Sequence, residues 1–320
     1  MIKKNKIMRT RQINAILFLT FLVSMPNTGL FARTITSTSS QNGTERLNET
    51  LVINSDYTIN GNLTATEVTI NSGCSLTING HLNTTGNLTI LGDGSLAINE
   101  GGELLVANNF NAKHTENGLI NKTKNYPNVV VNGSMTVEGT FACESHLTVN
   151  GEIETEDAIV KQDLTITENG ALVVYGQLTN YGVITDNGRL EAGRIDVVKE
   201  LTISSNAILY VNKDESDSKT NGDLIVRKDG KISFEKNSAT IVEGDLIQDG
   251  STLLGIHLLF PKPGDIKAYK ATVVVEGAYH IYTTEFNRLD ANCEYIDPKD
   301  NPRFFSFGGI KQSTIKQQTL

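Results

Sequence analysis

The fold is decided by residues 68–106, which read VTINSGCSLTINGHLNTTGNLTILGDGSLAINEGGELLV. In this stretch two apolar residues stand one residue apart, and Gly, Asn or Asp separates them from the next pair; the pairs are Val68/Ile70, Leu76/Ile78, Leu88/Ile90, Leu96/Ile98 and Leu104/Val106. Alternation with a period of two is typical of a β-strand, and Gly, Asn and Asp are typical of turns. Each unit therefore predicts a very short strand that ends in a turn.

The same pattern continues from Leu51 to Leu253. Most units start five to eight residues apart, so three units cover about 17 to 20 residues, enough for a coil of three short strands. We therefore expect an all-β fold, a single-stranded parallel β-helix (β-solenoid) of about ten coils over residues 51–254. The alternation directs the paired apolar residues, Leu96 among them, into a core of Leu, Ile and Val ladders, and the Thr residues between them outward.

The eight-residue steps predict a corner of stacked turns. Gly or Asn follows the apolar pair in these units, as in Ile70-Gly73-Leu76, Ile98-Gly102-Leu104, Ile166-Gly170-Leu172, Ile203-Asn206-Leu209 and Val226-Gly230-Ile232. Gly and Asn tolerate positive φ, which lets the chain reverse sharply.

Two polar stretches, residues 108–128 and 212–222, interrupt the repeat. We interpret them as loops extruded from the solenoid, because few of their residues could fill a core. Loops on a rigid scaffold often carry binding sites, and equally they are places where insertions are tolerated. The sequence leaves both interpretations open.

Residues 255–320 do not follow the repeat and are rich in Phe, Tyr and Pro. We expect a C-terminal cap or small β module that covers the last coil rather than extends it, since an uncovered coil exposes strand edges. Residues 269–275 and 279–286 predict two strands of a hairpin. Phe260, Tyr282 and Phe286 are the residues expected to pack on the last coil.

The N-terminal 32 residues predict a signal peptide cleaved after Ala32. Five basic residues precede an apolar run too short to span a bilayer comfortably, and this Lys-rich start is typical of bacteria. Residues 33–50 are polar and predict a flexible leader or an N-terminal cap. Cleavage removes five positive charges and changes the net charge from −8 to −13. Such an acidic chain is unsuited to nucleic acid, and we expect no transmembrane segment after cleavage.

The sequence contains no recognisable motif for chemistry. Its three cysteines, Cys74, Cys143 and Cys293, and its five histidines are scattered, without the spacing of a disulfide framework or a zinc site. We therefore expect no catalytic, cofactor-binding or metal-binding residues and no cofactor. The alternative is a pair of carboxylates for glycosidic acid/base work or calcium, drawn from Glu154, Glu156 and Asp157 or from Asp214, Glu215 and Asp217.

The repeats NSGCSLTINGHLNTTGNLTI, GDGSLAINEGGELLV and ENGALVVYGQLTNYGVI resemble the β-helical passenger regions of bacterial autotransporter and filamentous-haemagglutinin-type adhesins. The resemblance covers residues 51–254, concerns the fold alone and does not extend to a translocator barrel. Bactofilin-type polymer-forming proteins have similar repeats, although a signal peptide fits poorly with that cytoplasmic group. The resemblance implies export and a cell-surface or extracellular role, with the periplasm as the other compartment left open.

The leading functional hypothesis is an exported, non-enzymatic β-solenoid that acts as a structural or adhesive surface protein. Its partner would be a host or cell-surface glycan or a protein. Two alternatives remain: a carbohydrate-active β-helix enzyme, either a polysaccharide lyase or a hydrolase, and a solenoid that self-associates end to end.

Overall fold

The computed structural model describes residues 32–117, 123–214, 220–227 and 229–248 and the C-terminal segments 265–268, 271–277, 279–283, 303–306 and 310–314. The chain divides into a short unit, Met1–Phe31, and a second unit, Ala32–Leu320. The expected signal peptide lies outside the described residues, apart from Ala32 at its end. In the described part every element is a β-strand, and none of it is a helix that could cross a membrane.

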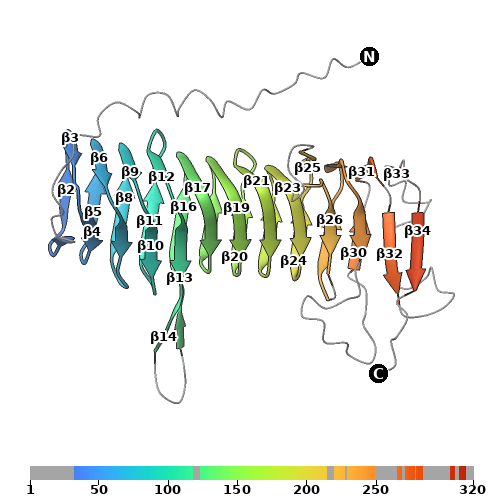
Figure 1. Cartoon of the computed structure of the whole chain (residues 1–320), viewed down its shortest axis with the longest axis horizontal. Helices are drawn as coiled ribbons and strands as arrows, with labels where there is room; N and C mark the ends of the chain where they lie inside the picture. Colours follow the sequence, from blue (N-terminus) through green and yellow to red (C-terminus); the bar gives the residue numbers. More distant parts are fainter. Residues whose placement is uncertain are drawn as a thin grey trace. The chain divides into compact units, whose positions relative to one another are not determined.

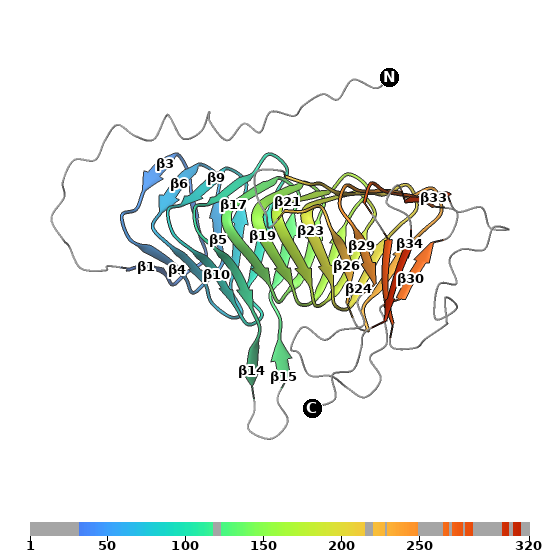
Figure 2. The ribbon, with the colours of Figure 1, turned by 45° about the vertical axis from the view of Figure 1, so that its right-hand side comes forward.

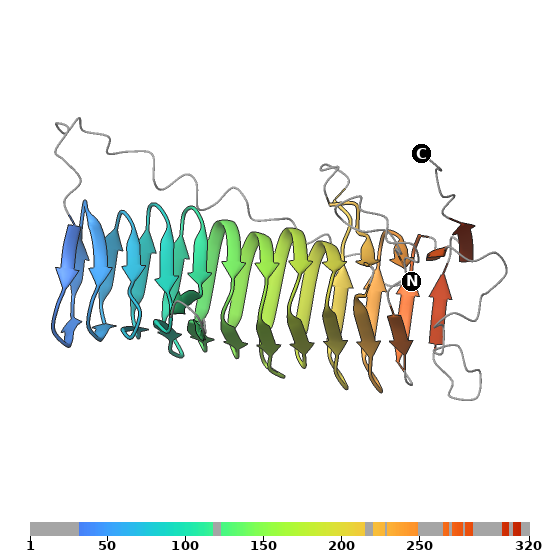
Figure 3. The same cartoon turned by 90° about the horizontal axis from the view of Figure 1, so that it is seen from below.

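The second unit is a parallel β-solenoid in which the strands of each coil pair with those of the next (Figures 1 and 3). Each coil has three faces. The first face is an 11-stranded parallel sheet, which gives 11 coils, close to the number expected from the repeat. Its strands are β2 (Ser39–Gln41), β5 (Tyr57–Ile59), β8 (Ser75–Ile78), β11 (Ser95–Ile98), β16 (Asn128–Val131), β18 (His146–Val149), β20 (Asp163–Ile166), β22 (Val183–Asp186), β24 (Glu200–Ile203), β27 (Lys231–Phe234) and β30 (Asp265–Ala268).

The second and third faces belong to one 21-stranded sheet. Strands confined to the second face are β3 (Thr44–Arg46), β6 (Asn62–Ala65), β9 (His81–Thr84), β12 (Glu103–Val106), β25 (Ile208–Val211), β28 (Ala239–Val242), β31 (Thr272–Val275) and β33 (Arg303–Ser306). Those confined to the third are β1 (Ala32–Ile35), β4 (Thr50–Ile53), β7 (Val68–Ile70), β10 (Leu88–Leu91), β13 (Phe110–Lys113), β26 (Leu224–Val226), β29 (Leu246–Gln248), β32 (Tyr279–Thr283) and β34 (Ile310–Thr314). Four long strands run through both faces: β17 (Ser134–Cys143), β19 (Glu152–Val160), β21 (Ala171–Asn180) and β23 (Arg189–Val197).

The core consists of the aliphatic ladders that the alternation predicts. Leu76 pairs with Leu96, which pairs with Val129 in the next coil, and all three side chains are at most 1% exposed. The outward residues between them, such as Thr77, are half-buried. Because strands in such ladders lie about 4.8 Å apart, each buried side chain packs on its equivalents above and below.

The glycine corners differ in part from the expectation. Positive φ occurs at Gly73 and Asn206, as expected. Gly170, however, is required for a different reason: a Cβ atom there would lie 2.1 Å from the carbonyl oxygen of Val149 in the preceding coil. Close approach between coils, as well as positive φ, therefore selects glycine in this solenoid.

Both ends of the predicted solenoid are extended in the structure. Residues 33–50, expected to be a flexible leader or N-terminal cap, contain β1, β2 and β3, which pair with β4, β5 and β6 and form the first coil. Their alternation is hidden because Arg, Ser, Gln and Glu occupy positions that the next coil fills with Leu, Tyr and Ile. Gln41, for instance, takes the place above Ile59 and is 6% exposed.

The C-terminal region extends the ladders, so the prediction of a cap that does not extend them is wrong. β30, β31 and β32 pair in parallel with β27, β28 and β29. The predicted hairpin is also absent from these residues, because β31 and β32 lie on two different faces of one coil. Gly277, taken as a hairpin turn, donates its N–H to the Gly244 carbonyl oxygen at 3.0 Å and so repeats the bend of the coil below. Phe260 and Phe286 lie outside the described residues, and Tyr282 pairs with Ser313 in β34.

The first insertion is shorter than predicted at its N-terminal side. Phe110 and Ala112 belong to β13 and are fully buried, and the Phe110 ring stacks on Phe141 with centroids 4.9 Å apart. The chain leaves the solenoid after Lys113 and forms β14 (Thr115–Asn117) and β15 (Thr123–Asn125), an antiparallel hairpin. In the second insertion, 212–222, an antiparallel bridge between Lys213 and Asn221 joins the two ends.

Candidate functional site

The β14–β15 hairpin projects from the corner between the third and first faces (Figure 2). It is inserted between β13 and β16, where the adjacent coil needs only Glu144 and Ser145 to connect Cys143 to His146. Its strands pair through Thr115 with Asn125 and Glu116 with Lys124. An isolated two-stranded hairpin has marginal stability in water, so contacts at its base are needed to hold it.

A cluster of polar and aromatic side chains, the hairpin-base cluster, supplies these contacts. It consists of His114 and Tyr126 from the ends of the hairpin, Glu144 and His146 from the next coil, and Lys161 and Asp163 from the coil after that. His114 Nδ1 lies 2.7 Å from Glu144 Oε2, and Lys161 Nζ forms an ion pair with the other carboxylate oxygen of Glu144. This chain of contacts joins the hairpin to two coils of the solenoid.

Glu144 is the centre of these contacts. Burial alone would raise the pKa of its carboxyl group, but hydrogen bonds and charges from Lys161 and His114 outweigh that effect, so the pKa lies below its ordinary value. The side chain is 21% exposed, which leaves it partly open to solvent.

Three rings form the other half of the cluster. The Tyr126 ring lies 5.4 Å from the His114 ring and 6.0 Å from the His146 ring, measured between centroids, and meets the second edge-on. His146 Nδ1 is 3.3 Å from Asp163 Oδ2, and both of those side chains are more than half exposed. The cluster thus offers ring faces, donors and acceptors next to a projecting hairpin, a combination suited to non-covalent binding.

Two of the carboxylates suggested by the sequence, Glu154 and Asp157, have structural partners. Asp157 Oδ1 accepts the backbone N–H of Gln177 at 2.8 Å, on the third face, whereas Glu154 accepts the Tyr175 hydroxyl at 3.0 Å on the second face. In the other set, Asp214 donates its N–H to the Thr220 carbonyl oxygen, while Glu215 and Asp217 lie outside the described residues. Of the cysteines, Cys143 is buried and Cys74 is partly exposed, and both are free; Cys293 is not in the described part.

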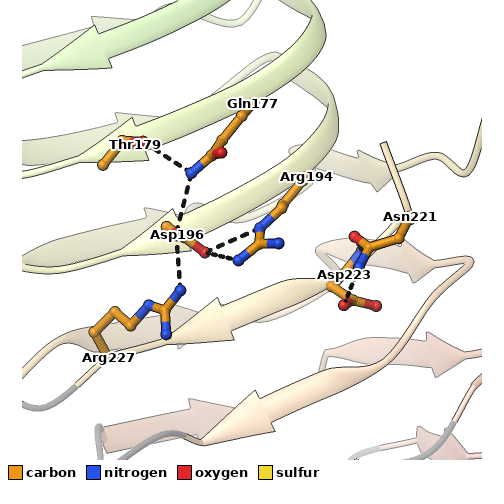
Figure 4. Close-up of polar contacts among 7 residues, drawn as sticks. All are labelled: Gln177, Thr179, Arg194, Asp196, Asn221, Asp223 and Arg227. Atoms are coloured by element: carbon orange, nitrogen blue, oxygen red, sulfur yellow. Dashed lines mark hydrogen bonds and ion pairs between the residues drawn. The ribbon is translucent and has the colours of Figure 1, made fainter. Parts of the chain in front are cut away.

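The structure reveals a buried carboxylate that the sequence analysis missed. Asp196 points outward from β23, yet its side chain is only 3% exposed. Its Oδ2 accepts hydrogen bonds from Arg227 at 3.0 Å and Gln177 at 3.1 Å, and its Oδ1 is 3.4 Å from Arg194 (Figure 4). The group clamps three consecutive coils. Arg194, two residues before Asp196 and therefore on the same side of the strand, was the signal available in the sequence.

The second insertion ends beside this group. Asn221 donates to Asp223 Oδ2 at 2.6 Å (Figure 4), and Asp223 Oδ1 accepts the N–H of Asp245 in the next coil at 2.8 Å. These contacts fix the bend between the second and third faces. Burial raises the pKa of Asp223 above its ordinary value.

An open polar pocket of 490 Å³ lies along the corner between the first and second faces. Its lining includes Thr167, Asn187, Ser204 and Glu235, which occupy the same corner position in four consecutive coils. In coils nearer the N-terminus this position is a ladder of asparagines, in which Asn60, Asn79 and Asn99 each donate to the preceding one at 2.6–3.0 Å.

Among the residues that the structure describes, no three His, Cys, Asp or Glu side chains are arranged to hold a metal ion. No family model, curated protein or solved structure matches the chain.

Proposed function

We propose that this protein is an exported, non-enzymatic β-solenoid that acts as a structural or adhesive element at the cell surface and binds its partner at the base of the β14–β15 hairpin. The observation that carries the proposal is the hairpin-base cluster, because half-buried and exposed rings and charges there accompany a hairpin that the coil itself does not need. The partner is a surface glycan or a protein of the host or of a neighbouring cell. Export rests on the basic and apolar residues at the N-terminus.

The test separates export from binding. Cell fractionation with surface labelling follows the native protein, and recovery of unlabelled protein in the cytoplasm would refute export. Binding is measured by retention of the purified protein on immobilised cell-surface material. A variant in which residues 113–127 are replaced by Glu-Ser, the connection used between Cys143 and His146, is expected to lose retention.

Two controls sharpen this experiment. Replacing residues 212–223 by Gly-Arg, the connection used between Ala192 and Ile195, shortens the other insertion and should leave retention unchanged. His146→Ala and Tyr126→Ala each remove one ring of the hairpin-base cluster without deleting hairpin residues 113–125, and we expect each to weaken retention at least tenfold. Equal retention by wild type and all these variants would place any binding site elsewhere.

One observation favours an enzymatic alternative. Glu154 and Glu191 occupy one ladder on the second face, separated by Val173. Two strand spacings of about 4.8 Å place them roughly 10 Å apart along the ladder, close to the carboxylate separation of inverting glycosidases. Tyr175 lies beside them, and burial, together with the carboxylates of Glu154, Glu152 and Glu191, raises its pKa to about 12.

The enzymatic alternative is tested by incubating the purified protein with a panel of plant, bacterial and animal polysaccharides and measuring new reducing ends and unsaturated products. Turnover that is lost in Glu154→Gln or Glu191→Gln would favour it over the adhesive function. No turnover on the panel would leave the adhesive function as the better explanation.

End-to-end self-association is the remaining alternative. In the described structure β1, β2 and β3 pair on one side only, with the second coil, so their outer edges remain available to another strand. Sedimentation analysis over a range of concentrations distinguishes a monomer from a growing polymer.

A further inference from the structure

One core ladder of the first face contains an acidic residue. From the second coil to the tenth its members are Ile59, Ile78, Ile98, Val131, Val149, Ile166, Asp186, Ile203 and Phe234. The Asp186 carboxyl group thus replaces an aliphatic side chain between Ile166 and Ile203. The residue is completely buried.

The hydrogen bonds of Asp186 are incomplete. Oδ1 accepts the N–H of Gly188 at 3.0 Å, whereas Oδ2 is buried and has no hydrogen-bond partner. The neighbouring buried Asn180 is different: it donates to the Glu200 carbonyl oxygen at 2.7 Å and accepts the Gly182 N–H at 2.9 Å. A buried carboxylate with an unpaired oxygen is costly, but a neutral carboxyl group at the same place is much less so.

The surroundings of Asp186 provide no compensating charge. In its own coil and in the two adjacent coils, the other inward positions hold Leu, Ile, Val, Ala and Asn180. The charged groups of the neighbouring elements lie on the outward side. They include Asp163 and Glu200 at the starts of β20 and β24, Arg189 and Glu191 in β23, and Glu168 and Glu235 at the corner. Burial is the cause that raises the pKa of Asp186, to about 7, and the hydrogen bond from Gly188 offsets part of it.

We propose that Asp186 is a protonation-controlled lock on its coil: the neutral carboxyl group keeps the corner between β22 and β23 closed, and its ionisation opens this corner toward the polar pocket. The corner is the part that moves, because Asn187 directly follows Asp186 and already lines that pocket together with Thr167 and Ser204. A carboxylate can regain water there through a movement of residues 186–188, without separation of the coils.

The direction with pH follows from the raised pKa. The folded state binds a proton that the unfolded state, with an ordinary aspartate, has already released. The stabilisation is therefore complete below pH 3.8 and is lost as the pH rises through about 7. Across that interval the equilibrium for opening increases up to about a thousandfold, because each unit of pKa difference corresponds to a factor of ten.

Hydrogen exchange of the full-length protein at pH 5 and pH 8, corrected for the intrinsic exchange rates, tests the lock. We expect peptides that cover residues 184–190 to lose protection at pH 8, while peptides of β8 and β11 do not. Asp186→Asn keeps an oxygen for the Gly188 N–H and cannot ionise, so its protection should be the same at both pH values. Glu235→Gln removes an exposed carboxylate of the same corner and should behave as the wild type.

A second variant guards against a folding defect in Asp186→Asn. Asp186→Val restores the aliphatic ladder, and its melting temperature relative to the wild type should rise between pH 5 and pH 8. The proposal is overturned if residues 184–190 exchange alike at both pH values in the wild type, or if the variants that lack the carboxylate retain the pH response.

Discussion

Coils built from residues 50–113 and those built from residues 146–211 have nearly the same length but different interiors. In the earlier coils the bend between the second and third faces separates two strands, as in β9 and β10, and Thr84 is the one polar side chain buried there. In the later coils β19, β21 and β23 run through the bend with a shift of register, and Thr155, Asn180 and Asp186 are buried.

This difference shows that the interior of a coil tolerates polar side chains where the coil itself provides their hydrogen-bond partners. Thr155 donates to the carbonyl oxygens of Gly139 and Asp157 at 3.0 Å, and Asn180 bonds within its own corner and to the next coil. The earlier coils are ordered mainly by apolar layers of similar side chains, and the later ones also by specific hydrogen bonds. Asp186 is the exception, because half of its carboxyl group has no partner.

Leu96→Asp should show how little the aliphatic coils tolerate a charge. Leu96 is 1% exposed, and a carboxylate there gains no partner of the kind that Gly188 provides for Asp186. We expect a loss of about 4 kcal/mol in the free energy of unfolding at pH 7. Urea unfolding followed by circular dichroism measures it. A loss below about 1 kcal/mol would mean that Leu96 does not lie in a rigid core.

Phe141→Ala examines the junction between the two sets of coils. The Phe141 ring stacks on the Phe110 ring, and both rings are fully buried. Along the chain, the hairpin lies between these two residues and so between the two sets of coils. Removing the ring leaves a cavity, and we expect a cost of about 3 kcal/mol. Phe141→Leu serves as the control and should cost less than half of that. Equal costs for the two variants would contradict the cavity as the cause of the loss, because Leu fills most of the space that Ala leaves empty.

Asn180→Ala tests whether hydrogen bonds order the later coils. The change leaves the Gly182 N–H and the Glu200 carbonyl oxygen without their side-chain partner. We expect a loss of about 2 kcal/mol, measured by urea unfolding, since two buried hydrogen bonds disappear. Asn79→Ala, in the exposed asparagine ladder, is the counterpart and should cost about 0.5 kcal/mol. A larger loss for Asn79→Ala would reverse the comparison.

Glu144→Gln should have the smallest effect and a defined dependence on pH. The pKa of Glu144 is lower in the folded protein than its ordinary value, so its contribution is present above the unfolded pKa and is lost as the pH falls through the folded value. We therefore expect the wild type to exceed Glu144→Gln in melting temperature at pH 7 and to lose this advantage below about pH 4. A difference that grows with acid would contradict the ion-pair geometry.

Much of the architecture followed from the sequence. The inward positions of Leu76, Leu96 and Leu104 and the outward position of Thr77 were predicted from their spacing alone. The first coil was missed because its interior residues, Gln41 for example, are not the aliphatic residues by which the repeat was recognised. In the C-terminal region the buried residues of β31, Val273 and Val275, are aliphatic, but the surrounding Phe, Tyr and Pro residues were interpreted as a change of structure.

The sequence by itself determined the coil, because alternation and turn residues act over three to eight neighbouring positions. Tertiary structure decided which side chains of neighbouring coils contact each other. His114 contacts Glu144 and Asp196 contacts Arg227, pairs that lie 30 and 31 residues apart. In a solenoid the partner of a side chain lies one coil away. An insertion increases the separation of the two partners in the sequence but leaves the spacing between their strands the same. The local pattern of the sequence therefore predicts the buried layers, whereas the sites on the surface depend on the stacking of the folded coils.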